Sequence, residues 1–325
     1  MPSRAEGSKG DVHLSVERRV KVIFNPNAGV GRFRVDETAL RDEFGKAAYR
    51  AGVSLDLDIE KTSEMGHCTE IAREAVRSGF DVIAAAGGDG TVMEAVNAIA
   101  GTGSLLGIVP IGSGNDTIVS IKGDASRSGC IEDIISGGPS RIDVGEMNGM
   151  LFLNVVGLGL DAEINHFVAD RRSLVRKIGP ALTYTYGALV VLMKFKPHRI
   201  SVSVDGGDAE EHTVSLCTIG NGTTCGGGYR LTPRALMNDG MLDLSISPYL
   251  GKIRSVLNIK KAYSGKHLEL EGSIYRTLRT MEVVGLDREL PYHIDGEGGY
   301  AERIAIRIIP GGLGTVHAPA GAVLE

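Results

Sequence analysis

Three turns of the chain place an acidic side chain beside glycines, a combination suited to phosphate chemistry. The first, in "AAAGGDGTVMEAV", surrounds Asp89 with Gly87, Gly88 and Gly90. Glycines let backbone N–H groups approach a phosphate, and the helix expected from Thr91 points its N-terminus at the same place. No G-x-x-x-x-G-K-[ST] motif occurs in the chain, and a G-x-G-x-x-G motif fails at Met93. A tight strand–helix turn capped by Asp89 is the structural alternative.

Two further carboxylates follow later turns, Asp116 in "PIGSGND" and Asp143 in "RIDVG". Three carboxylates at one sheet edge would repel one another and any phosphate, and a divalent cation or an ordered water shell removes that conflict. Mg²⁺ suits such a place because it keeps several waters and binds through one or two carboxylates plus substrate phosphates. The sequence therefore predicts that Asp89 meets a nucleotide through a metal ion, where the lysine of a phosphate-binding loop would meet it directly.

Strand-like and helix-like patterns alternate along the first part of the chain. Strands are expected over 20–25, 54–60, 81–88 and 104–112, and helices within 35–52, 63–79 and 91–100. This order, with short turns, predicts a parallel sheet covered on both faces. Ligands of such sheets bind beyond the C-terminal ends of the strands. The turns "NPNAG", "GGDGT" and "PIGSGND" follow strands, so they are the expected binding turns.

From about Arg141 the pattern changes to short alternating strands with hairpin turns. Turns are expected at Asn148-Gly149 and in "DGGD", and strands in "MLDLSIS", "TMEVVG", "PYHIDGE" and "ERIAIRII". Helical stretches near 171–196 and 251–263 interrupt them. We therefore predict an α/β plus all-β protein, with a nucleotide-binding α/β domain over 18–140 and an antiparallel β-sandwich domain over 141–310. The segment 311–325 is either a loose tail or a return to the first domain.

The overall composition argues against several classes of protein. The net charge is −5 and the pI about 5.9, which gives no electrostatic argument for nucleic-acid binding. The four cysteines are widely spaced, so reduced thiols in a cytosol are the expected state. The first twenty residues lack the apolar core of a signal peptide. The longest uncharged run, between Lys177 and Lys194, is shorter than the ~20 apolar residues of a spanning helix, so we expect a cytoplasmic protein that touches membranes only from the side.

Six segments occur in the order seen in one known family: "NPNAG", "GGDGTVMEAVN", "PIGSGND", "NVVGLGLDA", "GGGYRLTPRALMNDGMLDL" and "DGE". The chain thereby resembles the diacylglycerol kinase catalytic family, which includes bacterial soluble lipid kinases and the sphingosine and ceramide kinases. The resemblance covers roughly residues 20 to 310, and the compact length is most similar to the bacterial diacylglycerol kinases and YegS-like members. One departure is Ser113, where the family commonly has threonine; the hydroxyl is retained.

The resemblance implies a nucleotide site and a metal site. The implied ATP-contacting positions are Asn25, Pro26, Asn27, Ala28, Gly29, Thr62, Gly87, Gly88, Asp89, Gly90, Thr91, Glu94, Ser113, Gly114 and Asn115. Asp89, Asp116 and Asp143 match an acidic cluster thought to organise the catalytic Mg²⁺ and its water. The implied fold is a nucleotide domain plus a β-sandwich domain, with a cleft between them and a C-terminal segment that returns to the first domain.

Two more sites follow from the same resemblance. Asp239 matches a second, structural Mg²⁺ position, with main-chain oxygens expected near Leu236 and Met241. Asp295 and Glu297, in "IDGEGG", match the acid–base site.

The acid–base assignment also has physical support. Phosphoryl transfer needs a carboxylate within hydrogen-bond reach of the attacking hydroxyl. Asp295 ends an alternating strand of the second domain, so apposition of the two domains could bring it to the γ-phosphate. An ordinary Asp-Gly hairpin turn is the structural alternative. Whether Asp295 or Glu297 takes the proton stays open.

The segment 171–195 joins a basic start to an apolar remainder. Its basic residues are Arg171, Arg172, Arg176 and Lys177. The segment could border a lipid cleft and meet anionic headgroups, or it could pack as a helix on the sandwich with a solvated first turn.

The sequence as a whole predicts an ATP- and Mg²⁺-dependent lipid kinase that phosphorylates a hydroxyl of diacylglycerol or a related lipid. Its expected partners are a lipid substrate and, peripherally, the inner membrane face; the oligomeric state is open, a homodimer included. One alternative is a small-molecule kinase of the NAD kinase type, which shares the GGDGT-type turn but lacks the pair "PIGSGND" and "DGE". The other is a non-catalytic nucleotide- or lipid-binding regulator, although every acidic position of the family is present here.

Overall fold

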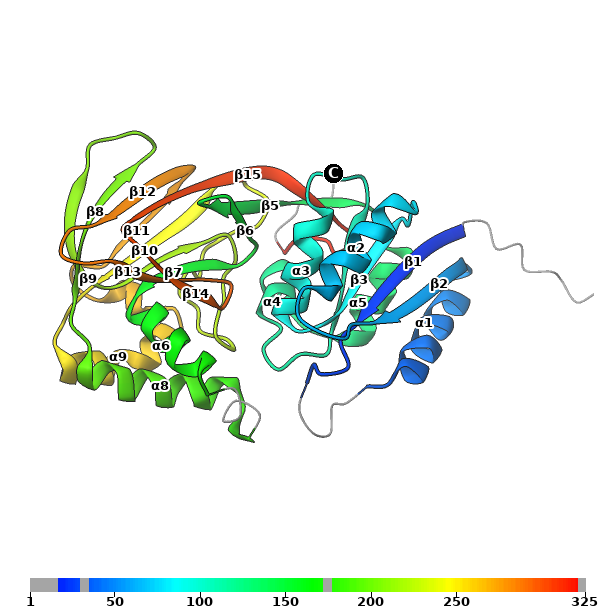
Figure 1. Cartoon of the computed structure of the whole chain (residues 1–325), viewed down its shortest axis with the longest axis horizontal. Coiled ribbons are helices and arrows are strands. Elements are labelled where there is room, and N and C mark those ends of the chain that lie inside the picture. The colour runs from blue at the N-terminus through cyan, green and yellow to red at the C-terminus, as the bar shows by residue number, and fades with distance from the viewer. Residues whose placement is uncertain (1–16, 30–34, 172–176, 321–325) are drawn as a thin grey trace, which may run out of the picture.

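The computed structural model describes residues 17–29, 35–171 and 177–320 (Figure 1). The first half contains a parallel sheet in the order β4-β3-β1-β2. Its strands are β1 (Glu17–Phe24), β2 (Ser54–Lys61), β3 (Val82–Gly87) and β4 (Leu105–Pro110). The helices are α1 (Glu37–Ala51), α2 (His67–Arg77), α3 (Asp89–Ile99), α4 (Asp116–Lys122) and α5 (Arg127–Ser136). The predicted parallel sheet is thereby confirmed.

Helices cover both faces of this sheet. In β3, Ile83 and Ala85 pack with α2 and α3, whereas Val82, Ala84 and Ala86 pack with α1 and α5. Successive side chains of a strand point to opposite faces, so a strand between two helical layers must be apolar throughout. The sequence "VIAAAG" meets that requirement, and every one of its residues is buried.

Local signals set the helix ends. The Asp36 side chain accepts the N–H of Ala39 at the start of α1, and Gly52 ends the helix in a left-handed conformation with φ of 66°. Helix α3 begins two residues before the expected Thr91, and its N-cap is Gly88. The glycine turn therefore runs directly into the helix.

The second half consists mainly of antiparallel strands, in the order β14-β13-β7-β9-β8-β12-β15. The strands are β5 (Ser140–Met147), β6 (Met150–Phe152), β7 (Val155–Gly159), β8 (His198–Val204), β9 (Glu210–Gly220), β10 (Leu242–Pro248), β11 (Ile274–Leu278), β12 (Thr280–Gly285), β13 (Leu290–Ile294), β14 (Glu297–Ala301) and β15 (Arg303–Thr315). The helical elements are α6 (Leu160–Ala169), α8 (Pro180–Lys194), α9 (Lys252–Tyr263) and the short 3₁₀ helix η2 (Lys266–Glu269). The predicted α/β plus β-sandwich architecture is confirmed.

The hairpin turns fall where the sequence places them. Asn148 and Gly149 have φ values of 48° and 85° between the paired strands β5 and β6. Asp205 and Gly206, in "DGGD", have φ values of 50° and 73° between β8 and β9. Two consecutive residues at positive φ match the twist of the flanking strands, which is why Asn-Gly and Asp-Gly pairs occupy such turns.

Strand β15 connects the two halves of the molecule. It pairs with β12 and β5 along its length, and at its end Thr315 pairs in parallel with Leu106 of β4. The Ile108 N–H then donates to Nε2 of buried His317. The chain after residue 310 thus lies against the first sheet (Figure 1). Residues 321–325 lie outside the described residues, so their return to the first domain stays a prediction. The domain limits at 140 and 310 also stay predictions.

A helical stretch is expected near 171–196, and the structure has α8 there, over Pro180–Lys194. Arg172 and Arg176 lie outside the described residues. Among the helices that the structure describes, none is both long enough and apolar enough to cross a membrane.

Candidate functional site

Two glycine turns meet at the C-terminal edge of the parallel sheet. A Cβ atom added to Gly112, after β4, would lie 2.4 Å from Cα of Gly88, after β3, so the two backbones can approach this closely only without a side chain. Asn115 closes the second turn, since its side chain accepts the N–H of Gly112 at 3.0 Å and donates to the carbonyl oxygen of Gly112 at 3.1 Å. The turns therefore present adjoining backbone to one cleft.

The Asp89 side chain does not cap its own helix. It is the first residue of α3, and its carboxylate accepts the N–H of Thr117 in α4 at 2.9 Å. A Cβ atom added to Gly114 would lie 3.2 Å from an Asp89 carboxylate oxygen and 3.4 Å from an Asp116 one. The carboxylates of Asp89 and Asp116 thus converge on one glycine, as the sequence predicted for this pair.

Asp116 connects the two halves of the molecule. Its side chain is 8% exposed and accepts the N–H groups of Gly227 at 2.8 Å and Gly228 at 2.9 Å. Both glycines belong to the loop between β9 and β10. Burial and the neighbouring charge of Asp89 raise the pKa of Asp116 to about 6, although the two N–H groups oppose that shift.

Asp295 occupies the β13–β14 turn at φ of 44°. Its carboxylate accepts the N–H groups of Leu153 at 2.7 Å, Asn154 at 3.0 Å and Val155 at 2.8 Å. Burial raises the pKa of Asp295 to about 6, with these N–H groups opposing and the charge of Asp89 adding to the rise. The donors fix the orientation of the carboxylate.

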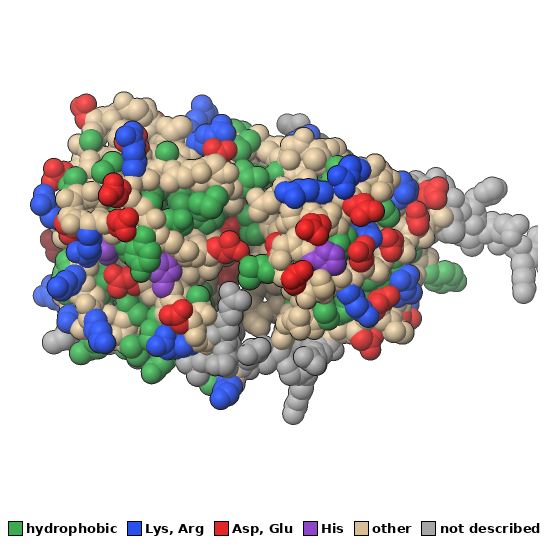
Figure 2. Space-filling model, in the orientation of Figure 1, with side chains coloured by type: hydrophobic (Ala, Val, Ile, Leu, Met, Phe, Trp, Pro, Cys, Tyr) green, Lys and Arg blue, Asp and Glu red, His purple; other side chains and the backbone are tan. Residues whose placement is uncertain are grey.

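Asp89, Asp116 and Asp295 line one cavity of about 220 Å³, here called the acidic cavity. Its other walls come from both halves of the chain and include Ser113, Gly114, Asn154, Asp161, Asn165, Tyr184, Cys225, Gly226, Gly227 and His293. Figure 2 shows acidic side chains where the two halves of the molecule meet.

A cleft of about 550 Å³, here called the glycine-turn cleft, adjoins this cavity. Of the predicted ATP positions it is lined by Asn25, Asn27, Ala28, Gly29, Thr62, Gly88, Gly90, Thr91, Glu94 and Ser113. Asp89 and Gly114 line the acidic cavity instead, and Pro26, Gly87 and Asn115 line neither. Asp295, Gly296 and Glu297 complete the cleft from the second half.

Hydrogen bonds connect the walls of the glycine-turn cleft. The Asn25 side chain donates to Oγ1 of Thr91 at 3.0 Å, which ties the "NPNAG" turn to the start of α3. The Glu94 carboxylate accepts the N–H of Cys68 at 3.1 Å, which ties α3 to α2.

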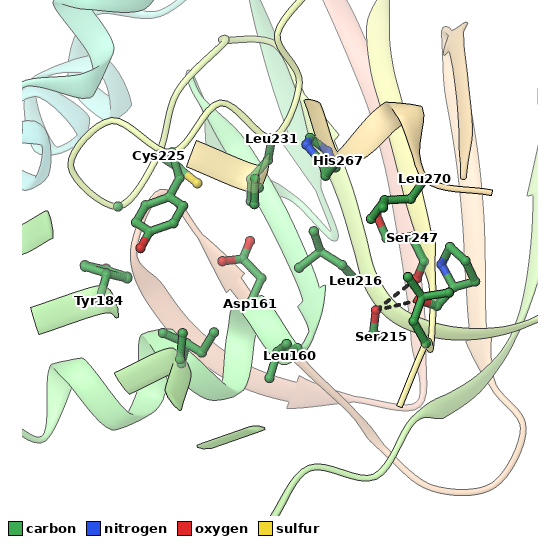
Figure 3. A pocket seen from close by; sticks show the side chains of 17 residues that line it. Leu160, Asp161, Tyr184, Ser215, Leu216, Cys225, Leu231, Ser247, His267 and Leu270 are labelled. Atoms are coloured by element: carbon green, nitrogen blue, oxygen red, sulfur yellow. Dashed lines mark hydrogen bonds between the residues drawn. The ribbon is translucent and has the colours of Figure 1, made fainter. Parts of the chain in front are cut away.

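On its other side the acidic cavity has an apolar pocket of about 120 Å³ as its neighbour. The pocket lies beside α6, α8, α9 and strands of the second half, and its walls include Leu160, Ile164, Ala188, Leu216, Leu231 and Leu270 (Figure 3). Asp161, Tyr184, Cys225 and Gly226 line both spaces, whereas Ser113, Asp295 and Gly296 line both the acidic cavity and the glycine-turn cleft. The three spaces therefore adjoin one another through shared walls, with the acidic cavity in the middle.

The sequence did not single out a buried histidine–carboxylate pair in the acidic cavity. Nε2 of His293 lies 2.9 Å from Oδ2 of Asp161. A Cβ atom added to Gly157 would come within 2.2 Å of that oxygen and 2.3 Å of that nitrogen, so the pair needs glycine beside it. His293 lies near the end of β13, two residues before the turn residue Asp295. This closeness in sequence to a predicted catalytic residue was a usable signal.

Asp143 is not brought to the acidic cavity, contrary to the expectation of three carboxylates at one edge. Its buried side chain accepts the N–H groups of Gly240 and Gly311, each at 2.7 Å. Asp143 belongs to β5, which pairs with β15, whereas Asp89 and Asp116 follow β3 and β4. Its charge acts instead on Asp239.

Asp239 and its neighbours form a separate loop near β5. One Asp239 oxygen accepts the N–H of Met241 at 3.0 Å, and the Met237 carbonyl accepts the N–H of Asp143. Burial and, in addition, the charge of Asp143 raise the pKa of Asp239. Leu236 is half exposed at the start of this loop. Within the described ranges, no group of three or more His, Cys, Asp or Glu side chains is placed to hold a metal ion by itself.

Comparison with known proteins finds two domain families that match the two halves of the chain. The family model of the diacylglycerol kinase catalytic domain matches residues 19–147, and that of the YegS C-terminal NAD kinase beta sandwich-like domain matches residues 154–317. Proteins named diacylglycerol kinase are similar to the chain. That of Bacillus subtilis (strain 168) is 28% identical and that of Staphylococcus aureus (strain bovine RF122 / ET3-1) 26% identical; the alignments cover 87% of this chain and 90% and 87% of those proteins.

Solved structures agree as well. A crystal structure of a putative diacylglycerol kinase from Bacillus anthracis str. Sterne superposes with a TM-score of 0.72 at 26% identity, over 93% of this chain and 98% of that one. The chain therefore has a diacylglycerol kinase catalytic domain over residues 19–147 and belongs, through residues 154–317, to the family of the YegS C-terminal NAD kinase beta sandwich-like domain; it is a kinase built from an α/β domain and a β-sandwich domain.

Proposed function

We propose that the protein is an ATP- and Mg²⁺-dependent lipid kinase that transfers the γ-phosphoryl group of ATP to a hydroxyl of diacylglycerol or a related lipid. The observation that carries this proposal is the row of three adjoining spaces that share walls: the glycine-turn cleft, the acidic cavity and the apolar pocket. In that order they suit a nucleotide, a reacting hydroxyl and an acyl chain. The names of the relatives support the choice of diacylglycerol.

The glycine-turn cleft suits the phosphates of ATP. Backbone N–H groups and the positive end of a helix dipole attract phosphate, and both are present where Gly88 leads into α3. The cleft also contains the hydroxyl groups of Thr62 and Ser113. None of the described residues that wall the cleft is a lysine or an arginine, so these residues supply no positive side chain to the phosphates.

The geometry favours Asp295 over Glu297 as the group that accepts the proton of the lipid hydroxyl. Asp295 lines both the glycine-turn cleft and the acidic cavity, whereas exposed Glu297 lines only the cleft. With a pKa of about 6, Asp295 is ionised at neutral pH, and its pKa lies close to that pH. Both properties suit a general base. Its backbone donors hold the carboxylate still, so no reorganisation is needed when the hydroxyl arrives.

Asp89 and Asp116 fit a hard cation such as Mg²⁺. They offer carboxylate oxygen, the donor that Mg²⁺ prefers. Burial and, after it, repulsion from Asp89 raise the pKa of Asp116, and a bound cation would relieve that repulsion. Two carboxylates are few for a protein-only site, but Mg²⁺ completes its shell with water and substrate phosphates. When bound, the ion supplies charge neutralisation to the transferring phosphoryl group.

Asp239 fits a second, structural Mg²⁺ position. Two like charges, Asp143 and Asp239, lie near each other there, with main-chain oxygens of the same loop. We expect millimolar Mg²⁺ to raise the melting temperature of the wild type and to raise that of Asp239→Ala less. The neutral variant Asp239→Asn is the matched control for loss of charge alone. Equal Mg²⁺ effects on wild type and Asp239→Ala would refute this position.

The proposed function is tested with a lipid panel and labelled ATP in detergent micelles, with and without Mg²⁺. We expect Mg²⁺-dependent incorporation into diacylglycerol. In Ala188→Phe, a larger side chain enters the apolar pocket, and overpacking costs ~1–3 kcal/mol, so kcat/KM for lipid should fall by about tenfold or more while KM for ATP stays. Val190→Phe is the matched control on the same helix, because Val190 is partly exposed and lines none of the three spaces.

Other outcomes of the panel separate the alternatives. Phosphorylation of NAD⁺ and of no lipid would identify a small-molecule kinase. ATP binding without transfer to any acceptor would identify a regulator. Either result overturns the lipid-kinase proposal.

We further propose that α8 docks on an anionic membrane surface from the cytoplasmic side. An exposed apolar stripe runs along α8 and includes one residue just before the helix. Its members are Ile178, Leu182, Tyr186, Leu189 and Met193. Lysines flank it, and along the lower edge of Figure 2, over α8 and α9, basic and hydrophobic side chains lie together. Apolar side chains bordered by basic ones suit a bilayer with anionic headgroups. Because α8 also walls the apolar pocket, docking would place the pocket next to lipid.

Co-sedimentation with vesicles tests the docking surface. We expect binding to vesicles containing phosphatidylglycerol and weak binding to pure phosphatidylcholine. Equal binding to both kinds of vesicle, or binding to neither kind, would refute the proposal. A stable dimer without vesicles would show that the stripe pairs two copies instead.

A further inference from the structure

The acidic cavity contains buried polar atoms that the proposed function leaves unused. Oδ1 of Asn165 and Nδ1 of His293 have no hydrogen-bond partner among the described residues. The two residues are 4% and 3% exposed. Buried polar groups are nearly always paired, and leaving one unpaired costs free energy. Two such atoms on residues that line one cavity indicate that a polar ligand completes them.

Asp161 and Asn165 place this polar set where the acidic cavity joins the apolar pocket. Asp161 lines both spaces, and Figure 3 shows its carboxylate pointing into the space among Tyr184, Leu216 and Leu231. The Asn165 side-chain amide donates to the Tyr184 hydroxyl at 3.2 Å, and Tyr184 also lines both spaces. A lipid whose chains occupy the apolar pocket would have its headgroup at this junction.

His293 balances the charge of Asp161 at the junction. Burial alone would lower the pKa of His293, but the charge and the hydrogen bond of Asp161, together with the charge of Asp295, outweigh burial and raise it. A protonated imidazole beside a carboxylate makes a pair with no net charge. The unpartnered Nδ1 atom and the Asn165 amide oxygen remain for the hydroxyl and ester groups of a ligand.

We propose that Asp161, Asn165 and His293 form the lipid headgroup site, and that His293 suits this site to an uncharged, hydroxyl-bearing glycerol ester over an amino alcohol. This inference rests on the proposed function. An ammonium group gains most from an unbalanced buried carboxylate, and His293 removes that gain at Asp161. Asp89, Asp116 and Asp295 also attract a cation; a charge on His293 offsets part of the attraction of Asp295 as well as that of Asp161, so the effect of His293 appears in a ratio between substrates.

The test compares kcat/KM for diacylglycerol and for sphingosine, a long-chain amino alcohol, in the same micelles and at saturating ATP. In His293→Gln, the side chain can still donate to Asp161 but carries no charge. We expect the diacylglycerol-to-sphingosine ratio to fall by about tenfold, mainly through the KM values of the lipids, with KM for ATP unchanged. Adding Asp161→Asn to His293→Gln removes the unbalanced charge, so the ratio should return toward that of the wild type.

Two further variants keep the test decisive. Asn165→Asp adds a negative charge at the same junction without changing side-chain size, and it should shift the ratio in the same direction even if His293→Gln is too unstable to assay. His198→Gln is the matched control, because His198 is another buried histidine beside a carboxylate, Glu163, and lines none of the three spaces.

The failures of the two proposals are distinguishable. An unchanged ratio in folded His293→Gln or Asn165→Asp overturns the headgroup assignment while lipid phosphorylation stands. Absence of lipid phosphorylation by the wild type overturns the proposed function itself.

Discussion

Asp295→Asn is expected to lower kcat for lipid phosphorylation by roughly 10²–10⁴-fold, the range that a general base typically contributes, while ATP binding persists. The substitution removes the proton acceptor and leaves the glycine turns at Gly88 and Gly112 in place. Single-turnover transfer from labelled ATP measures the loss, and equilibrium ATP binding measures what remains. Turnover like that of the wild type would refute the assignment.

The structure requires a control for folding in this experiment. The Asp295 carboxylate accepts three backbone N–H groups, and an asparagine amide turns one of its two oxygens into a donor that faces them. The melting temperature of Asp295→Asn must therefore be compared with that of the wild type. Glu297→Gln is the matched variant from the same turn, and we expect a much smaller loss because Glu297 does not line the acidic cavity.

The pH profile of the wild type checks the same group. A carboxylate must be ionised to accept a proton, and burial raises the pKa of Asp295 to about 6. The activity of the enzyme should therefore fall as the pH drops through about 6. If the base were a carboxylate with an ordinary pKa, the enzyme would stay active down to about pH 4. An acid limb near pH 4 would count against Asp295.

Gly112→Ala is expected to cost most of the affinity for ATP. Its new Cβ atom would meet Cα of Gly88 at 2.4 Å, and because that atom is backbone, the two turns must separate. Overpacking of this kind costs ~1–3 kcal/mol, and here the displaced backbone walls the glycine-turn cleft. Isothermal titration with ATP should show at least about a tenfold loss, accompanied by a lower melting temperature.

Gly103→Ala is the matched control for this substitution. A Cβ atom at Gly103 meets nothing within 4 Å, its φ is not in the left-handed region, and Gly103 lies outside the cleft. We expect ATP affinity like that of the wild type. If Gly112→Ala bound ATP equally well, the close approach of the two turns would have no part in nucleotide binding.

Local patterns in the sequence carried much of the fold. A strand buried on both faces must be apolar throughout, as β3 is, and positive-φ pairs such as Asn148-Gly149 mark hairpins. The turn that holds Asp89 could be located because glycine spacing is a local feature. The convergence of Asp89 and Asp116 also followed, since parallel strands end at one edge of a sheet.

Contacts between distant segments could not be read in this way. Asp143 precedes a glycine in a turn-like stretch, as an acidic-cluster residue would, yet β5 pairs with β15 and carries it to the loop of Asp239. The pair of Asp161 and His293 joins residues 132 positions apart. Such pairs depend on how the strands of the second half are ordered, which alternation alone does not determine.

The course of β15 has a consequence for how the protein can be divided. After leaving the sandwich, the chain inserts Leu313 into the core beneath α2 and α3 and Val316 into the core beneath α1 and α5. A fragment cut near residue 140 would expose both of these layers at once, because it lacks the residues that seal them. The α/β half is thus completed only by residues that the ribosome adds after the whole sandwich, so a chain stopped before Leu313 could not seal either layer.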